Sequence, residues 1–409
     1  MRPYQYSRLR GAGKAAKANT IPRVGVACLA SSNKRYRLFV AAAALLLLVS
    51  PLSIASAESL GQWTKTTNYP VALNGVSCVT LSATIVCVGG LGGGGNSHSQ
   101  VYYATVGASG IGSWSAGQAY PTAIDSASCV NATAGVYCVG GENGSTVLDD
   151  VYFGAASSSG VGSWSSEVAY PSSLAAVSCV GYSGDIYCVG GFDNNGDEVS
   201  STYYASISSG LTSWTGTTQY PLAVDSASCM VYAGDIYCVA GETENGSNQN
   251  SPISNVYYAP LSSSGIGQWT AALSYPTALA APSCVSYSGY LYCVGGFDSN
   301  QYSSTDAYFG SASPSGVGSW SNATPYPVPI DTASCVTYRG YIYCVSGTSD
   351  TQSSQAIVSS SYYAPISGVV TTTSTTPEFP ITVAVPLTLA FGLLVVAGLG
   401  RLRTKKSER

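Results

Sequence analysis

The chain has 409 residues and a formal net charge of −4, and its charges are sharply segregated. Fourteen of the sixteen Lys and Arg lie in residues 1–37 or 401–409, whereas the segment 58–380 holds nineteen acidic residues against Lys65 and Arg339. A surface with so few cations cannot neutralise phosphates, which excludes nucleic acid as a natural partner. Its remaining polar surface, rich in Ser, Thr, Gly, Asn and Tyr, suits an extracellular protein.

Residues 1–57 have the layout of a secretory signal peptide with a long basic region. A basic stretch that ends at Arg37 precedes an apolar run over 38–50, and the small residues Ala55-Ser56-Ala57 follow. This order predicts export and cleavage after Ala57. Retention of the same run as a signal anchor is the alternative.

From Trp63 onward the chain repeats a unit of 50 to 55 residues six times. The clearest copy of its central stretch, residues 178–191, has two apolar runs around Ser183-Gly184 and predicts a β-hairpin. With Ser183-Gly184 as a two-residue turn, Cys179 faces Cys188 at a non-hydrogen-bonded pair. The Cα atoms come closest at such pairs, which suits a disulfide.

Twelve of the thirteen cysteines form pairs of this kind, nine positions apart. The predicted disulfides are Cys78–Cys87, Cys129–Cys138, Cys179–Cys188, Cys229–Cys238, Cys284–Cys293 and Cys335–Cys344. The odd cysteine, Cys28, lies upstream of the predicted cleavage site, so the exported chain would have no free thiol. The alternative is that the twelve are reduced and buried as small hydrophobic residues.

Each unit continues with a polar loop, a strand with two adjacent aromatic residues, a turn, a Trp and a Tyr-Pro step. Four short strands per unit, without helical periodicity, predict the blade of a β-propeller. The first strand, around Trp63, has no predecessor, and the last, around Tyr362, has no Trp strand after it. We therefore expect the N-terminal strand to complete the last blade, which removes two exposed sheet edges. The Tyr and Trp residues recur in every unit, so we expect them to pack between blades.

This order resembles the kelch family, whose unit has an apolar-Tyr-x-x-Gly-Gly strand followed by an aromatic residue and a Trp. Residues 186–191 with Trp214 match the kelch order, as do residues 291–296 with Trp320. The resemblance covers residues 60–368. It implies an all-β fold, a six-bladed propeller over 58–368. The cysteine pairs are not part of the general kelch pattern, which indicates a secreted, disulfide-bearing form.

The C-terminal residues have the layout of a membrane anchor. A Thr- and Ser-rich spacer over 369–380 ends in Pro-Glu-Phe-Pro, and residues 381–400 carry no charge and are long enough to cross a membrane as a helix. The basic residues of 401–409 predict a cytoplasmic tail and a single-pass protein at the cell surface. The arrangement resembles the sorting signals of archaeal surface proteins, which implies a tail that is either retained or exchanged for a lipid.

Several chemistries are excluded by what the chain lacks. The galactose-oxidase relatives of kelch propellers hold copper with two histidines, but His98 is the one histidine in this chain. A His-rich zinc site fails for the same reason, and no nucleophile-elbow motif is present. Sialidases use several arginines, and the propeller segment has Arg339 alone. We predict no catalytic residue and no transition-metal site.

Oxygen-bearing side chains remain as candidates for ligand binding. The position four residues before the first Cys of each unit is occupied by Asn74, Asp125, Ala175, Asp225, Ala280 and Asp331. In a kelch-like ring this position lies just before the innermost strand, so the four polar members would surround the mouth of the central channel. Their oxygens suit Ca²⁺, the one cofactor considered, or sugar hydroxyls. The alternative is that each Asp only shapes its local turn.

The acidic loops after the Gly-Gly steps, at 142–143, 193–198, 242–250 and 298–300, are a second candidate for the binding site. Asn131, Asn143, Asn245 and Asn322 begin sequons and are predicted glycosylation sites.

These features together predict a cell-surface propeller that binds an extracellular glycan or surface protein without catalysis. One alternative is an extracellular carbohydrate-active enzyme that uses channel-mouth carboxylates. The other is a structural component of the cell envelope.

Overall fold

The computed structural model describes residues 59–132, 134–157, 160–208, 210–245 and 249–367, and the regular structure in these ranges is β throughout. The predicted signal peptide, spacer, membrane segment and cytoplasmic tail lie outside the described residues. Within the described ranges, no helix is long and apolar enough to cross a membrane.

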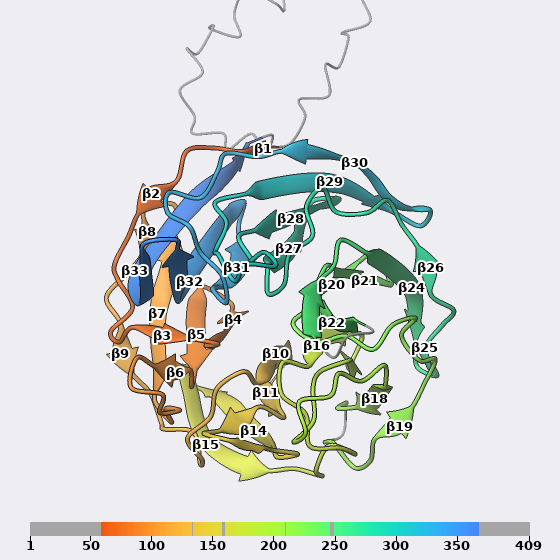
Figure 1. The fold of residues 1–409 in the computed structure, drawn as a ribbon. Coiled ribbons are helices and arrows are strands. Elements are labelled where there is room, and N and C mark those ends of the chain that lie inside the picture. The colour runs from red at the N-terminus through yellow and green to blue at the C-terminus, as the bar shows by residue number, and fades with distance from the viewer. Residues whose placement is uncertain (1–58, 133, 158–159, 209, 246–248, 368–409) are drawn as a thin grey trace, which may run out of the picture. The chain divides into compact units, whose positions relative to one another are not determined.

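Six antiparallel sheets, blades 1 to 6, form a ring (Figure 1). Blade 1 consists of β4 (Ser77–Leu81), β5 (Thr84–Val88), β7 (Val101–Gly107), β8 (Gly110–Ile111) and β9 (Ser115–Ala116). Blade 2 consists of β10 (Ser128–Ala132), β11 (Gly135–Val139), β14 (Val151–Ser157) and β15 (Gly160–Ser166). Blade 3 consists of β16 (Ser178–Tyr182), β17 (Asp185–Val189), β18 (Thr202–Ser206) and β19 (Thr215–Gly216).

Blade 4 consists of β20 (Ser228–Tyr232), β21 (Asp235–Val239), β24 (Val256–Ser262), β25 (Gly265–Ile266) and β26 (Thr270–Ala271). Blade 5 consists of β27 (Ser283–Tyr287), β28 (Tyr290–Val294), β29 (Ala307–Ser313) and β30 (Gly316–Asn322). Blade 6 consists of β31 (Ser334–Tyr338), β32 (Tyr341–Thr351), β33 (Ser354–Ser367), β1 (Ser59–Leu60) and β2 (Thr64–Lys65). The first strands contact one another in the order β4, β10, β16, β20, β27 and β31, and β31 contacts β4.

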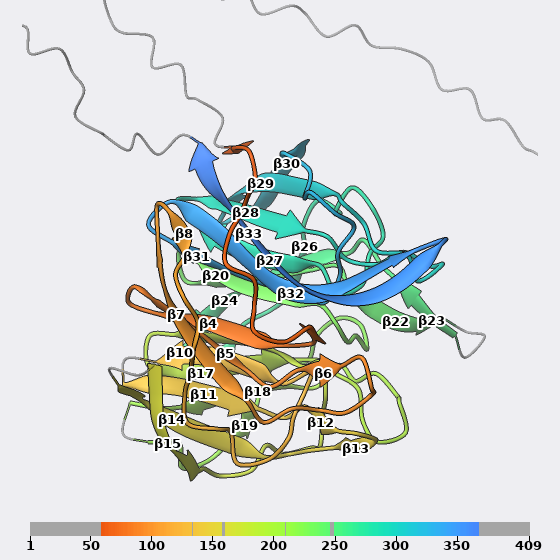
Figure 2. The same ribbon diagram turned by 90° about the vertical axis from the view of Figure 1, so that its left-hand side faces the viewer.

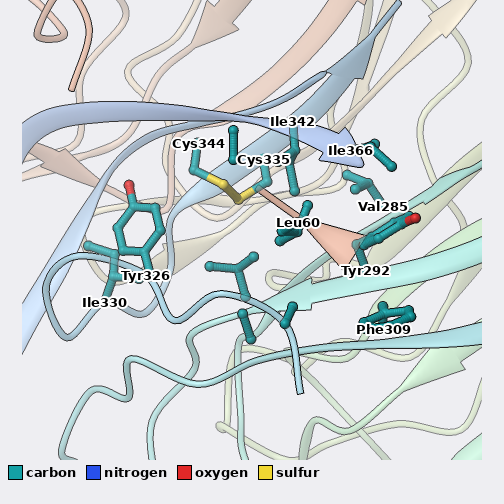
Figure 3. Close-up of a cluster of buried hydrophobic side chains, with 14 residues drawn as sticks. Leu60, Val285, Tyr292, Phe309, Tyr326, Ile330, Cys335, Ile342, Cys344 and Ile366 are labelled. Carbon is teal, nitrogen blue, oxygen red and sulfur yellow. A yellow bond between two sulfur atoms is a disulfide. The ribbon is translucent and has the colours of Figure 1, made fainter. Parts of the chain in front are cut away.

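The N-terminal strands close the ring, as the sequence predicts. Ser59 pairs with Ser367 and Thr64 with Tyr363, so β1 and β2 supply the outer strands of blade 6. Leu60 is buried among Ile342, Ile366 and Tyr292 in the core between blades 5 and 6 (Figure 3). Residues from the two ends of the described chain therefore share one hydrophobic core.

The predicted hairpin register and all six predicted disulfides are confirmed. Cys179 pairs with Cys188 across β16 and β17, and the Cα atoms of each of the six cysteine pairs lie 4.0 Å apart. Such a short distance is typical of a non-hydrogen-bonded pair. Each disulfide thus joins the first and second strands of one blade.

A ring of hydrogen bonds links the first strands of neighbouring blades. The amide of the first Cys in each blade donates to the Ser Oγ of the preceding blade, over 2.9–3.0 Å. The pairs are Cys78–Ser334, Cys129–Ser77, Cys179–Ser128, Cys229–Ser178, Cys284–Ser228 and Cys335–Ser283. The link from Cys78 to Ser334 joins the first blade to the last, so the ring of hydrogen bonds is closed.

The aromatic residues of the repeat pack as expected. The ring of Tyr170 makes edge contacts with Trp214 and Tyr203, at centroid distances of 4.9 and 5.4 Å. The tyrosines of all six Tyr-Pro steps are buried in the same way. These six tyrosines are part of the hydrophobic cores and are not available to a ligand.

The ring has two different faces. The loop face carries the segments that follow the Gly-Gly steps, including the ribbons β3 (Leu73–Asn74) with β6 (Leu91–Gly92), β12 (Glu142–Asn143) with β13 (Thr146–Val147), and β22 (Glu242–Asn245) with β23 (Gln249–Pro252). Figure 2 shows β6, β12, β13, β22 and β23 on one side of the ring, together with the far tip of β32 and β33. The hairpin face, on the other side, carries the turns between the first and second strands, such as residues 183–184.

Two tyrosine hydroxyls in different surroundings allow a test of this packing. The hydroxyl of Tyr187 donates to the Ser262 carbonyl oxygen at 2.8 Å, whereas the buried hydroxyl of Tyr170 has no hydrogen-bond partner among the described residues. We expect Tyr187→Phe to lower the free energy of unfolding by about 1 kcal/mol and Tyr170→Phe to leave it unchanged or raise it. Urea unfolding of the two variants in parallel checks this, and equal losses at both positions would contradict it.

Candidate functional site

On the loop face, the residue after the Gly-Gly step, which is Ala240-Gly241 in blade 4 and Ser346-Gly347 in blade 6, pairs with the residue four positions before the first Cys. These pairs are Asn74–Leu91, Asp125–Glu142, Ala175–Phe192, Asp225–Glu242, Ala280–Phe297 and Asp331–Thr348. Acidic residues therefore occur at this position in blades 2, 4 and 6, and Ala with Phe in blades 3 and 5. The predicted place of the Asp residues, just before the innermost strands, is the one observed.

In blade 2, two backbone hydrogen bonds of 3.0 and 2.9 Å join Asp125 and Glu142, and the carboxyl groups of the two residues interact. Asp125 is only 3% exposed, and its oxygens accept hydrogen bonds from Ser97 Oγ at 2.6 Å and Ser126 Oγ at 3.0 Å. Burial, the negative charge of Asp125 and the hydrogen bond between the two groups raise the pKa of Glu142 to about 7. Burial also raises the pKa of Asp125. Glu142 is therefore partly protonated near neutral pH.

In blade 6 the equivalent aspartate, Asp331, is bound by hydroxyl groups and not by a second carboxyl group. Ser303 Oγ, from the loop of blade 5, and Thr332 Oγ1 donate to the carboxylate of Asp331. Burial raises the pKa of Asp331 to about 6 in spite of these hydrogen bonds. Asn74 of blade 1 lies next to this blade, because its Nδ2 donates to Thr348 Oγ1 at 3.1 Å.

In blade 4 the pair Asp225 and Glu242 is joined by a third acidic residue, which takes the place that Ser97 has beside Asp125 in blade 2. Glu198 pairs with the residue after the Gly-Gly step of blade 3, as Ser97 and Ser303 do in blades 1 and 5. Burial and the negative charge of Glu198 raise the pKa of Asp225 to about 6. Burial and the charges of Asp225 and Glu198 raise the pKa of Glu242 to about 7. Two of these side chains are deeply buried, with Asp225 4% and Glu242 8% exposed.

The four predicted ligand residues are not brought together into one site. Asn74, Asp125, Asp225 and Asp331 belong to four different blades. The cavity of about 340 Å³ in the central channel is lined by residues of the first strands, such as Val79, and not by these four. No cluster of three or more His, Cys, Asp or Glu that could hold a metal ion occurs among the described residues. Calcium binding therefore stays a prediction.

The acidic loops follow the second strands of the blades, as predicted. In two of them a carboxylate accepts hydrogen bonds from backbone amides of the same loop. Asp193 accepts the backbone amides of Asn195 and Asp197 at 2.8 and 3.1 Å. These hydrogen bonds hold the pKa of Asp193 below its ordinary value. The turn at Asp298 has the same geometry, with the amides of Asn300 and Tyr302 as donors.

The loop face is strongly acidic. All described acidic residues except Asp185 and Asp235 lie in its loops or at its rim. Of the two described basic residues, Arg339 lies in a turn of the hairpin face and Lys65 in β2 at the outer edge of blade 6. A concentration of one charge without counter-charge attracts cations and cationic partners.

The predicted glycosylation sites are compatible with the structure where it describes them. Asn131, Asn143 and Asn322 are exposed, and the side chain of Asn245 lies outside the described part of the chain. Glycosylation stays a prediction at all four.

The comparisons with known proteins support the fold alone. No protein-family model and no curated protein matches the sequence. Among solved structures, the chain is similar to "Structure of YjhT", with a TM-score of 0.58 and 14% sequence identity over 72% of this chain and 95% of that chain. With its closed ring of six blades, the described region is a six-bladed β-propeller. At this low identity the kelch resemblance stays a prediction.

The raised carboxyl pKa values predict a protein that is more stable in mild acid than in weak alkali. The folded pKa values of about 6 for Asp225 and about 7 for Glu242 lie above the ordinary values near 4 of an unfolded chain. A carboxyl with a raised folded pKa contributes stability below its unfolded pKa and loses it as the pH rises through its folded pKa. We therefore expect the Tm of residues 58–368 to fall as the pH rises from about 5 to about 8.

Two variants test whether these buried carboxyl groups cause the dependence of Tm on pH. Tm is measured by scanning calorimetry. Glu242→Gln should reduce the slope of Tm against pH, because the amide does not titrate. Asp193→Asn should leave the slope unchanged, because the lowered pKa of Asp193 places its titration below this pH range. A Tm that is constant or rises between these pH values contradicts the prediction.

Proposed function

We propose that the protein is a non-enzymatic binding or adhesion protein of the cell surface, and that the acidic loop face is its contact surface. The observation that supports this most is the contrast between the blades and their loops. The blades repeat one disulfide-linked hairpin, whereas the segments after the Gly-Gly steps differ in length and form, from the ribbon β22–β23 to the extended pair β32–β33. Variable loops on a rigid scaffold are the usual place of binding residues.

Because the loop face is acidic, we expect its binding partner to be a surface protein with a basic segment and not a neutral molecule. Exposed acids such as Asp149, Asp197 and Glu244 lie on this face without a described basic residue beside them. Complementary charge increases both the rate and the selectivity of association. A glycan bridged by Ca²⁺ is the second candidate, because carboxylate oxygens are the ligands that this ion prefers.

The carboxyl pair of blade 2 is the feature that bears on an enzymatic role. Glu142 has a raised pKa and lies beside Asp125, as a general acid would. The carboxyl groups of glycosidases, however, lie about 5 to 10 Å apart, so that a substrate atom or water fits between them. The carboxyl groups of Asp125 and Glu142 instead interact with each other, and Asp125 is only 3% exposed with its oxygens bound by Ser97 and Ser126, which favours binding over catalysis.

Six disulfides support a location outside the cytoplasm, because disulfides persist in oxidising compartments. The predicted signal peptide and the predicted C-terminal membrane segment agree with this location. We therefore place the propeller on the outer side of the membrane, tethered by its C-terminal segment.

The proposal is tested by the binding of labelled residues 58–368 to intact cells of the source organism that lack the protein. We expect saturable binding that weakens at high salt. Replacement of Asp149, Asp197 and Glu244 by the corresponding amides should weaken binding roughly tenfold, because it removes three charges from the contact surface. A Ca²⁺ bridge would show as loss of binding in EDTA.

Asp235→Asn is the control for position, since it removes a charge from the hairpin face on the opposite side and should leave binding unchanged. Absence of saturable binding, or equal binding by the triple variant, would contradict the loop-face proposal. Regular self-assembly of the purified protein without a partner would favour a structural role in the envelope.

A further inference from the structure

We propose that the hairpin face carries a saccharide-binding pocket between blades 2 and 3, a site that does not depend on the loop-face partner. The cavity there has a volume of about 750 Å³. Small-molecule sites typically measure about 300 to 1,000 Å³. Blade 2 contributes Asn131, Tyr137 and Phe153 to its lining, and blade 3 contributes residues 181–185 and 207–208.

The cavity exists because blade 2 lacks two side chains that the later blades have. Ala132 occupies a position that is Tyr in blades 3 to 6, namely Tyr182, Tyr232, Tyr287 and Tyr338. In blade 3 this Tyr covers the turn of the next blade, since a Cβ placed on Gly234 would lie 3.2 Å from the Tyr182 hydroxyl oxygen. Gly135 likewise occupies a position that is Asp or Tyr in blades 3 to 6.

A third departure from the repeat, in blade 3, opens the cavity from the other side. Trp214 follows Thr202 by twelve positions, whereas Trp269 follows Val256 by thirteen, so the turn after the third strand of blade 3 is one residue shorter. The third strand itself is shorter too, since β18 ends at Ser206 where β24 continues to Ser262. Three independent departures in two blades thus affect the same place.

The shorter turn leaves a tyrosine hydroxyl without its usual partner. In blades 3, 4 and 6 the equivalent hydroxyls donate to a carbonyl oxygen in the third strand of the next blade. These hydrogen bonds are Tyr187 to Ser262 at 2.8 Å, Tyr237 to Ser313 at 2.7 Å and Tyr343 to Gly107 at 2.9 Å. Tyr137 is only 4% exposed and lines the cavity, and its hydroxyl has no hydrogen-bond partner among the described residues. A ligand in the cavity would supply one.

The lining combines aromatic rings with neutral polar groups. Phe153 lies against Tyr137 at a centroid distance of 4.7 Å, and Tyr182 is 37% exposed. Asn131, with Ser183 and Ser208, provides hydrogen-bonding groups. A sugar ring has C–H faces that pack on aromatic rings and hydroxyls that both donate and accept hydrogen bonds, so it matches both kinds of surface.

The charge of the lining disfavours an anionic sugar. Asp185 is the charged residue of the lining, and no Lys or Arg accompanies it among the residues that surround the cavity. Its carboxylate would repel a phosphorylated or carboxylated ligand, whereas it can accept hydrogen bonds from sugar hydroxyls. The cavity therefore suits a neutral mono- or disaccharide.

Saturation-transfer NMR of the full-length protein with glucose, galactose, mannose, N-acetylglucosamine and lactose tests the proposal. All samples carry Thr133→Ala, which removes the sequon at Asn131 and so keeps a host glycan away from the pocket. We expect at least one sugar to receive saturation. Ala132→Tyr should abolish this transfer while Tm is unchanged, because it restores the side chain of blades 3 to 6. Tyr137→Phe should weaken binding about tenfold, because it removes the free hydroxyl.

Leu81→Tyr is the matched control, since it introduces the same side chain at the equivalent position of blade 1 and should leave the sugar signal intact. The proposal is overturned if none of the five sugars receives saturation, or if Ala132→Tyr and Leu81→Tyr reduce the signal alike. A failure of cell binding by the loop face would leave this result unaffected, so the two proposals fail separately.

Discussion

The hydrogen bond from each first-strand cysteine amide to a serine hydroxyl of the preceding blade holds the centre of the ring together. Cys179 and Cys188 face each other at a non-hydrogen-bonded pair, so the Cys179 amide points away from β17 toward the open edge of the blade. A buried amide without a partner at that edge would be destabilising, and Ser128 Oγ accepts its hydrogen bond at 2.9 Å. One register therefore explains both the disulfide within a blade and the link between blades.

This repeated centre allows the two faces of the ring to differ without loss of the fold. On the loop face, the carboxyl groups of Asp125 and Glu142 interact and the pKa of Glu142 is raised, whereas Phe192 occupies the equivalent of Glu142 in the next blade. On the hairpin face, Ala132 and Gly135 leave a cavity that larger residues fill elsewhere. None of these positions belongs to the Ser–Cys links or to the disulfides. Function can therefore vary at the faces while the links at the centre stay the same.

The sequence predicts most of the fold because its rules are local and repeated six times. Facing cysteines, two-residue turns and an unmatched first strand are all visible in the chain, and the structure confirms each. The loop-face carboxyls are only partly predictable. Asp125 and Asp331 are recognisable from their position, but Ser97 and Ser303 reach them from the preceding blade, and such contacts depend on how neighbouring blades pack. The pocket beside Tyr137 is harder still to predict, because it results from two side chains that are missing in blade 2 together with a shorter turn in blade 3.

Residue-resolved hydrogen–deuterium exchange of the cysteine amides is the most direct test of the closed ring. The five links from Cys129 to Cys335 join blades that are consecutive in the chain, whereas the link from Cys78 to Ser334 joins its two ends. We predict that the Cys78 amide exchanges as slowly as the other five. Fast exchange at Cys78 beside slow exchange at the other five would show that blades 1 and 6 separate in solution, and it would contradict a closed propeller.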